Sequence, residues 1–129
     1  MFDSGVFNYI DVLDKAADAS WLRNEVISNN IANVNTPEYK RQDVSFEAEL
    51  QQALRANKYE SLDDKIDSVN LKRLDARVYT DSADFSYRLD GNNVDIDNEN
   101  VELASNQIKY NALIQSINGK FSELKSVMK

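Results

Sequence analysis

The residues best suited to chemistry are acidic side chains crowded into one segment, residues 90–102. Ca²⁺ selects oxygen ligands, and an EF-hand loop needs glycine at its sixth position and glutamate at its twelfth. Counted from Asp95, those two positions hold Asn100 and Asn106. The acidic run is therefore interpreted as turn chemistry followed by negative charge at a helix start, where the helix dipole favours it.

Most other routes to catalysis or metal binding lack the residues they need. The chain contains no cysteine and no histidine, which excludes structural zinc sites and thiol or imidazole catalysis. The 22 acidic residues leave a small carboxylate enzyme open, but no pair is marked by its spacing. Glycine occurs only at positions 5, 91 and 119, too sparsely for a phosphate-binding loop. We expect no enzymatic activity, metal, cofactor or small-molecule substrate.

The charge balance argues against two classes of partner. The formal net charge is −7, whereas binding to nucleic acid or to an anionic membrane surface depends on Lys and Arg. No run of about 20 apolar residues occurs, so no transmembrane helix is predicted. Acidic residues stand where a signal peptide would have its basic and apolar regions, so we expect no cleaved signal.

Two stripes of mainly apolar residues, each with a heptad period, predict the two helices to which the rest of the chain is attached. The N-terminal stripe is Val6, Ile10, Leu13, Ala17, Ser20, Asn24, Ile27, Ile31 and Val34. The C-terminal stripe is Leu103, Gln107, Tyr110, Ile114, Ile117, Phe121, Leu124 and Met128. This period predicts helices that pair with each other or with other subunits. Further apolar residues off the stripes, such as Trp21 and Ile108, need neighbours that an assembly could supply.

The predicted fold is mainly α, an elongated coiled coil of N- and C-terminal helices with a short middle helix and a small β-hairpin. We divide the chain into a helical region 1–36, a middle segment 37–97 and a helical region 98–129. The middle holds a connector over 38–44 and a short amphipathic helix over about 45–58, with Phe46, Leu50 and Leu54 on one face. Residues 59–80 are expected to be flexible, with at most a weak helix marked by Leu62, Ile66, Val69 and Leu74. The middle segment ends in a hairpin whose strands are 85–89 and 94–96. Asp97 or Asn98 is the expected cap of the last helix.

The end of the first helix is rich in asparagine, a poor helix former. Thr36-Pro37 stops the helix, because a residue before proline is pushed out of the α region. The cluster comprises Ser28, Asn29, Asn30, Asn33 and Asn35. Two interpretations stay open: a fraying helix end, which physics alone favours, or a row of amides that hydrogen-bond to neighbouring subunits.

The run Ile27-Ser-Asn-Asn-Ile-Ala-Asn-Val-Asn-Thr-Pro-Glu-Tyr-Lys40 resembles a motif of bacterial flagellar axial proteins, the family of rod, hook and hook-associated subunits. Residues 41–46 and 90–97 are similar to the rod members. The family usually has glycine where this chain has Glu38, and with glutamate there we expect the turn after Pro37 to keep a negative φ.

The resemblance implies a structural subunit of the flagellar proximal rod. Its terminal helices would line a hollow drive shaft that transmits motor torque. The chain would be exported by the flagellar type III apparatus into the periplasmic rod, without signal cleavage. Its partners would be other copies, neighbouring rod proteins and proteins at the membrane-ring and export-gate junction. A soluble coiled-coil adaptor or export chaperone is the alternative.

The candidate assembly interface combines both stripes with the asparagine junction. Its residues are Val6, Ile10, Leu13, Ile27, Asn29, Asn30, Ile31, Asn33, Val34, Thr36, Pro37, Leu103, Tyr110, Ile114, Ile117, Phe121 and Leu124.

Overall fold

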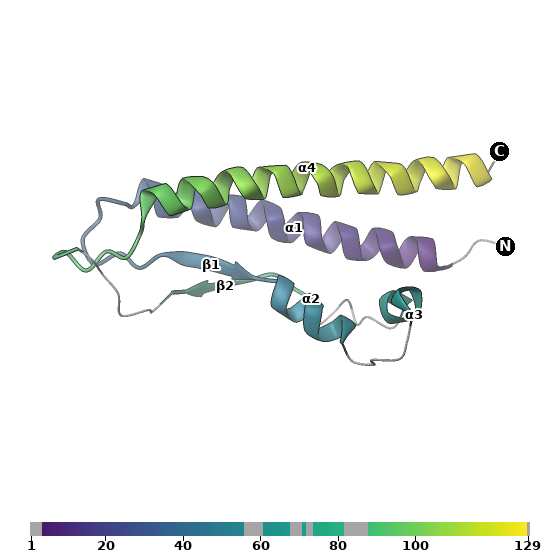
Figure 1. The fold of residues 1–129 in the computed structure, drawn as a ribbon, viewed down its shortest axis with the longest axis horizontal. Coiled ribbons are helices and arrows are strands. Elements are labelled where there is room, and N and C mark those ends of the chain that lie inside the picture. Colours follow the sequence, from purple (N-terminus) through teal and green to yellow (C-terminus); the bar gives the residue numbers. More distant parts are fainter. Residues whose placement is uncertain (1–3, 56–60, 68–70, 72–73, 82–87, 129) are drawn as a thin grey trace.

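The computed structural model describes residues 4–55, 61–67, 71, 74–81 and 88–128. Its elements are α1 (Ser4–Ala32), β1 (Gln42–Ser45), α2 (Glu47–Leu54), α3 (Leu62–Asp67), β2 (Arg77–Thr80) and α4 (Ile96–Val127). The long helices α1 and α4 lie side by side, and the other elements line the opposite side of α1 (Figure 1). The predicted mainly helical, elongated fold is confirmed. In the described part, no helix is both long and apolar enough to cross a bilayer.

The long helices lie where the stripes predict them, but the N-cap residue of α4 is not the predicted one. Asp95 is the N-cap, and its carboxylate accepts from the backbone N–H groups of Asp97 and Asn98 at 3.0 and 3.3 Å. The expected caps Asp97 and Asn98 lie inside the first turn, so that prediction was wrong. Asp95 has the extended backbone that suits a capping residue. Asp95, Asp97 and Asn98 are all residue types that cap helices, so the residue type alone does not identify the cap.

The two-stranded sheet exists, but it is not built from the predicted strands. β1 pairs antiparallel with β2, with Gln42 opposite Thr80 and Ser45 opposite Arg77. Of the predicted hairpin, residues 85–87 lie outside the described residues, Val94 is buried without strand structure, and Ile96 opens α4. The alternation at 94–96 reflects one core contact followed by a helix cap, not a strand.

A small core ties the middle segment to α1. Ala19 of α1, Phe46 and Leu74 are buried together, and Leu50 of α2 packs against them. The predicted short helix exists as α2 but is shorter than expected, and Phe46 is its N-cap residue rather than part of its apolar face. Within the stretch 59–80, expected to be flexible, the described residues include α3, which lies where weak helix was considered and buries Ile66, and β2.

The turn after Pro37 differs from expectation. Glu38 has a φ of 61°, the left-handed conformation that glycine adopts most easily, so the predicted negative φ was wrong. Its N–H donates to the carbonyl oxygen of Asp90 at 2.7 Å, which holds the turn against the 88–91 loop. A tertiary hydrogen bond thus imposes the family's glycine-like geometry on a glutamate.

A Glu38→Gly variant is therefore expected to be more stable. Removing the side chain relieves the left-handed strain, and the greater freedom of glycine in the unfolded chain offsets part of the gain. We expect the free energy of unfolding in urea to rise by about 0.5–1 kcal/mol. Glu38→Ala is the control, because it keeps the β-carbon and hence the strain. Equal stability of the two variants would contradict a strained turn.

Candidate functional site

The two stripes meet between α1 and α4, and each is covered only in part. On α1, Ala17, Ser20 and Ile27 are buried. On α4, no apolar stripe residue is fully buried: Leu103, Tyr110, Ile114, Ile117 and Leu124 are half-buried, and Phe121 and Met128 are exposed. One partner helix therefore leaves much of the apolar surface of α4 in contact with water.

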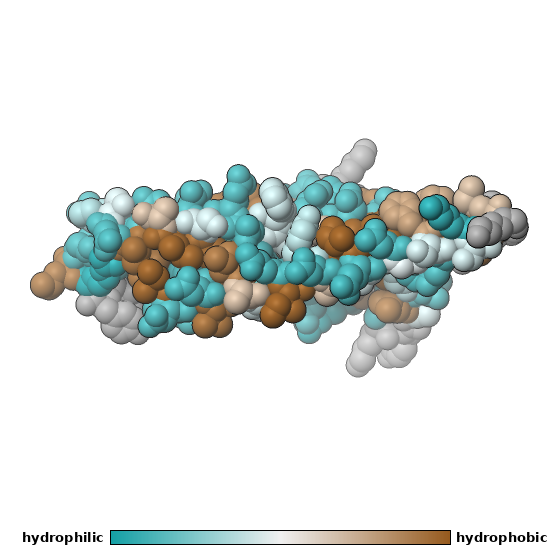
Figure 2. Space-filling model, turned by 90° about the horizontal axis from the view of Figure 1, so that it is seen from above, coloured by the Kyte–Doolittle hydropathy of each residue, from teal (hydrophilic) through white to brown (hydrophobic). Residues whose placement is uncertain are grey.

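Several large apolar side chains of α1 and α4 remain exposed to solvent. The exposed fractions are 61% for Trp21 and 72% for Ile108, and Phe7, Val101 and Val127 are also exposed. Figure 2 shows hydrophobic patches on the α4 side of the molecule, including one towards the N-terminal end of α4. Exposed patches of this kind mark protein–protein contact sites. We call the exposed set Phe7, Trp21, Val101, Ile108 and Val127 the outer apolar face.

Asn30 is the centre of a buried polar cluster. Its side chain is fully buried, and its amide nitrogen donates to the Gln42 carbonyl oxygen at 2.7 Å and to Glu99 at 3.1 Å. Its side-chain oxygen accepts from the Tyr39 hydroxyl at 3.0 Å and from the Gln42 N–H at 2.9 Å. An asparagine amide can make four such bonds, so all of them are used within the chain.

Arg41 completes this cluster by joining three carboxylates. Its guanidinium donates to Glu99 at 2.9 Å, to Asp81 at 2.9 Å and to Asp43 at 3.2 Å. Burial by itself lowers the pKa of Arg41, but the hydrogen bonds to Glu99 and Asp81 outweigh it, so the pKa lies above its usual value. Glu99 is only 2% exposed. Asn30, Tyr39, Arg41, Asp81 and Glu99 form what we call the polar junction.

The C-terminal end of α1 is capped rather than frayed. The Asn92 amide is buried and donates to the carbonyl oxygens of Asn33, Val34 and Thr36 at 2.8, 3.1 and 2.9 Å. These bonds hold the carbonyl groups of the turn that follows α1, while the Asn33 N–H closes the last helical turn on the Asn29 carbonyl oxygen at 3.1 Å. The fraying interpretation was therefore wrong. The signal that could have located the cap is the Asn pair after Asp90-Gly91, since such side chains readily bond nearby backbone.

The residues predicted to form the asparagine-rich contact between subunits differ in how far they are buried within this subunit. Asn29, Thr36 and Pro37 are exposed and Asn33 is half-buried, with its amide donating to the Asn29 carbonyl oxygen at 2.8 Å. Their contact with other subunits stays a prediction. Asn30, by contrast, lies inside the subunit.

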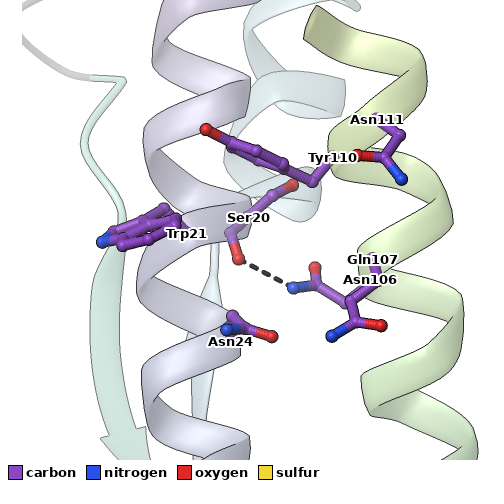
Figure 3. A pocket seen from close by; sticks show the side chains of 7 residues that line it. All are labelled: Ser20, Trp21, Asn24, Asn106, Gln107, Tyr110 and Asn111. Atoms are coloured by element: carbon purple, nitrogen blue, oxygen red, sulfur yellow. Dashed lines mark hydrogen bonds between the residues drawn. The ribbon is translucent and has the colours of Figure 1, made fainter.

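A small amide-lined pocket interrupts the apolar seam near its middle (Figure 3). Its volume is about 250 Å³, and it is lined by Ser20, Trp21, Asn24, Asn106, Gln107, Tyr110 and Asn111. The buried Asn106 amide donates across the helices to the Ser20 carbonyl oxygen at 2.7 Å. Polar layers of this kind fix the register of paired helices. We call this pocket the amide notch.

An ion-pair cluster links α1, α2 and α4 on another side of the seam. Glu47 accepts from Arg23 at 2.5 Å and from Lys109 at 2.6 Å. The hydrogen bond from Arg23, opposed by partial burial and supported by Lys109, lowers the pKa of Glu47 to about 2 from an ordinary 4.5. A carboxyl group with a lowered native pKa stabilises the fold above its unfolded pKa.

The contribution of Glu47 is expected to disappear in acid. It is fully present above about pH 4.5 and is lost as the pH falls towards about 2. Because the Glu47 side chain is 46% exposed, solvent screening reduces the expected effect to about 1 kcal/mol. Urea unfolding at about pH 6 and about pH 2.5 should show a smaller acid-induced loss for Glu47→Gln than for the parent chain. Glu49→Gln on the same helix is the control, and an equal acid-induced loss in Glu47→Gln and the parent would contradict the assignment.

Three of the acidic residues in the segment 90–102 have structural partners. Asp90 pairs with Arg88 at 3.1 Å, Asp95 caps α4 and Glu99 pairs with Arg41. Within the described ranges, no group of three or more Asp or Glu side chains is arranged to hold a metal ion. These ion pairs and hydrogen bonds hold residues 39–43, residue 81 and residues 90–99 against the paired helices.

Comparison with known proteins agrees with this architecture. The sequence model of the family described as "Flagella basal body rod protein" matches residues 11–40. The flagellar basal body rod protein FlgB of Bacillus subtilis is 41% identical, over 92% of each chain. FlgB of Borreliella burgdorferi is 36% identical, over 94% of this chain and 90% of its own. FlgB of Escherichia coli is 28% identical, over 82% of each. By similarity along almost its whole length, the chain belongs to the FlgB family of flagellar basal body rod proteins, which are structural components and not enzymes.

Proposed function

We propose that this rod component is a subunit of the periplasmic proximal rod, that it polymerises through its terminal helices, and that the polymer transmits motor torque. The observation that carries the proposal is the outer apolar face on a pair of helices already packed together. Trp21 and Ile108 are more than half exposed. Apolar area of this extent is stabilised when neighbouring subunits cover it.

Torque transmission requires that the subunit move as one body. The polar junction supports this role, because it ties β1, β2 and the start of α4 to the end of α1 through charge-assisted hydrogen bonds. A force applied to the middle segment would therefore reach both long helices. The amide notch and the Glu47 ion pairs fix the helices against sliding along each other.

The proposed partners are other copies of the chain, neighbouring rod proteins, and proteins at the membrane-ring and export-gate junction. The chain would reach the rod through the flagellar export apparatus without cleavage of a signal peptide. The family membership supports the basal-body location, and the finer position within it is our proposal.

Concentration-dependent light scattering combined with electron microscopy of the purified chain tests the proposal. We expect scattering to rise steeply above a threshold concentration and elongated or ring-shaped assemblies to form. A discrete dimer whose mass stays constant with concentration would instead support the coiled-coil adaptor. In cells, loss of the export apparatus should keep the chain out of the basal body, and its arrival there by another route would contradict the proposed export.

A further inference from the structure

The amide notch has the chemistry of a binding site, beyond its role in the seam. We propose that it binds the guanidinium group of an arginine side chain from a neighbouring subunit. The identity of the neighbour rests on the proposed function, whereas the chemistry of the notch does not.

Two hydrogen-bond acceptors in the notch are left over by the fold. Among the described residues, the side-chain oxygens of Asn24 and Asn106 are buried and accept no hydrogen bond. Asn106 is 4% exposed, and its amide nitrogen is already used by the Ser20 carbonyl oxygen. A buried acceptor without a donor costs about 1–3 kcal/mol, so an incoming donor group gains what the isolated chain lacks. The notch therefore offers two free buried acceptors to a ligand that carries several N–H donors.

The wall of the notch favours a planar cation among such donors. Tyr110 reaches from α4 towards α1, which carries Trp21, and the two ring centroids are 6.0 Å apart with an angle of 48° between the rings (Figure 3). A guanidinium group has five N–H donors and no acceptor, and its face stacks on aromatic rings. Cation–π attraction is strongest at tryptophan. An arginine side chain can therefore donate to the free amide oxygens of Asn24 and Asn106 and can also stack on an aromatic ring.

The charges around the notch also favour a cation. Asp18 and Glu25 are exposed and lie three residues before and four residues after Trp21 on α1, which places them along the same helix face. Two basic side chains lie close in sequence, Arg23 beside Asn24 on α1 and Lys109 three residues from Asn106 on α4. Both are paired with Glu47, at 2.5 and 2.6 Å. The net charge of −7 adds to this attraction.

Trp21 is the only tryptophan in the chain, so its fluorescence reports directly on the notch. The test is a titration of the full chain with N-acetylarginine N-methylamide at low ionic strength. The control ligand is N-acetylcitrulline N-methylamide, which has similar shape and N–H donors but no charge. We expect a saturable change in Trp21 emission with the arginine ligand, and binding about fivefold weaker with citrulline.

Variants locate the effect within the notch. Asn24→Leu removes one free acceptor while keeping the hydrogen bond from Asn106 to Ser20, and it should weaken arginine binding several-fold with unchanged circular dichroism. Gln115→Leu, at an exposed position elsewhere on α4, is the matched control and should bind as the parent chain does. Equal binding of the two ligands, or no binding of either, would overturn the proposal and leave the notch as a water site.

The same samples separate this inference from the proposed function. A chain that assembles by light scattering but does not prefer arginine overturns the notch alone. A chain that binds the arginine ligand but never assembles supports the chemistry of the notch and overturns a neighbouring subunit as the source.

Discussion

An Ile108→Asp variant should fold like the parent chain and fail to assemble. The Ile108 side chain is 72% exposed in the single subunit, so a carboxylate at that position costs little there. If neighbouring subunits cover the outer apolar face, the same carboxylate is buried without a partner at a cost of several kcal/mol per subunit. Circular dichroism should be unchanged, light scattering should lose its rise with concentration, and a strain carrying the variant should be non-motile.

The matched control is Ser116→Asp, which adds the same charge at another exposed position of α4, turned roughly 80° around the helix from Ile108. Ile114→Asp and Ile117→Asp are informative in a different way. These residues are half-buried on the α4 stripe, so a charge there should disturb the pairing with α1 as well as assembly. Normal assembly of Ile108→Asp would show that the outer apolar face is not the contact surface.

The second large effect is expected at the polar junction. Replacing Arg41 with Met removes the cation from Glu99, which is 2% exposed, and from Asp81. A buried charge that loses its partner destabilises a fold by about 3–5 kcal/mol. We therefore expect the urea midpoint of Arg41→Met to fall by a corresponding amount, with the β1–β2 region losing protection from hydrogen exchange first.

Two comparisons show whether the loss comes from the uncompensated carboxylate. Arg77→Met changes an exposed arginine in β2 and should cost much less. The double variant Arg41→Met/Glu99→Met should be more stable than Arg41→Met alone, because the buried charge is gone. A double variant as unstable as the sum of its single changes would indicate that Arg41 acts mainly through packing.

The parts of the fold that could be predicted are those encoded locally. The heptad stripes gave α1 and α4 nearly to their ends, and Phe46 and Leu50 located α2. The β1–β2 pair could not be found in the same way. Its strands are four residues each and 31 residues separate them, so their pairing depends on contacts that no local period reveals.

The polar junction could not be predicted from the sequence for the same reason. Arg41 and Glu99 are 58 positions apart, and only the fold brings them together. The asparagine cluster stands out in the sequence, but the residue type alone does not tell whether an amide faces inward or outward. Asn30 faces the buried junction, while Asn29 next to it is exposed. Glu38 shows the limit most clearly, because its backbone conformation is fixed by a hydrogen bond to residue 90.

The central proposal is that paired α1 and α4 helices build the rod wall through their outer apolar face. A density map of the isolated basal body, at a resolution that shows side chains, tests this most directly. We predict that the chain occupies the proximal rod, with α1 and α4 packed as in Figure 1 and with Trp21 and Ile108 covered by neighbouring subunits. A rod in which those two side chains face solvent, while the middle segments make the contacts between subunits, would contradict it.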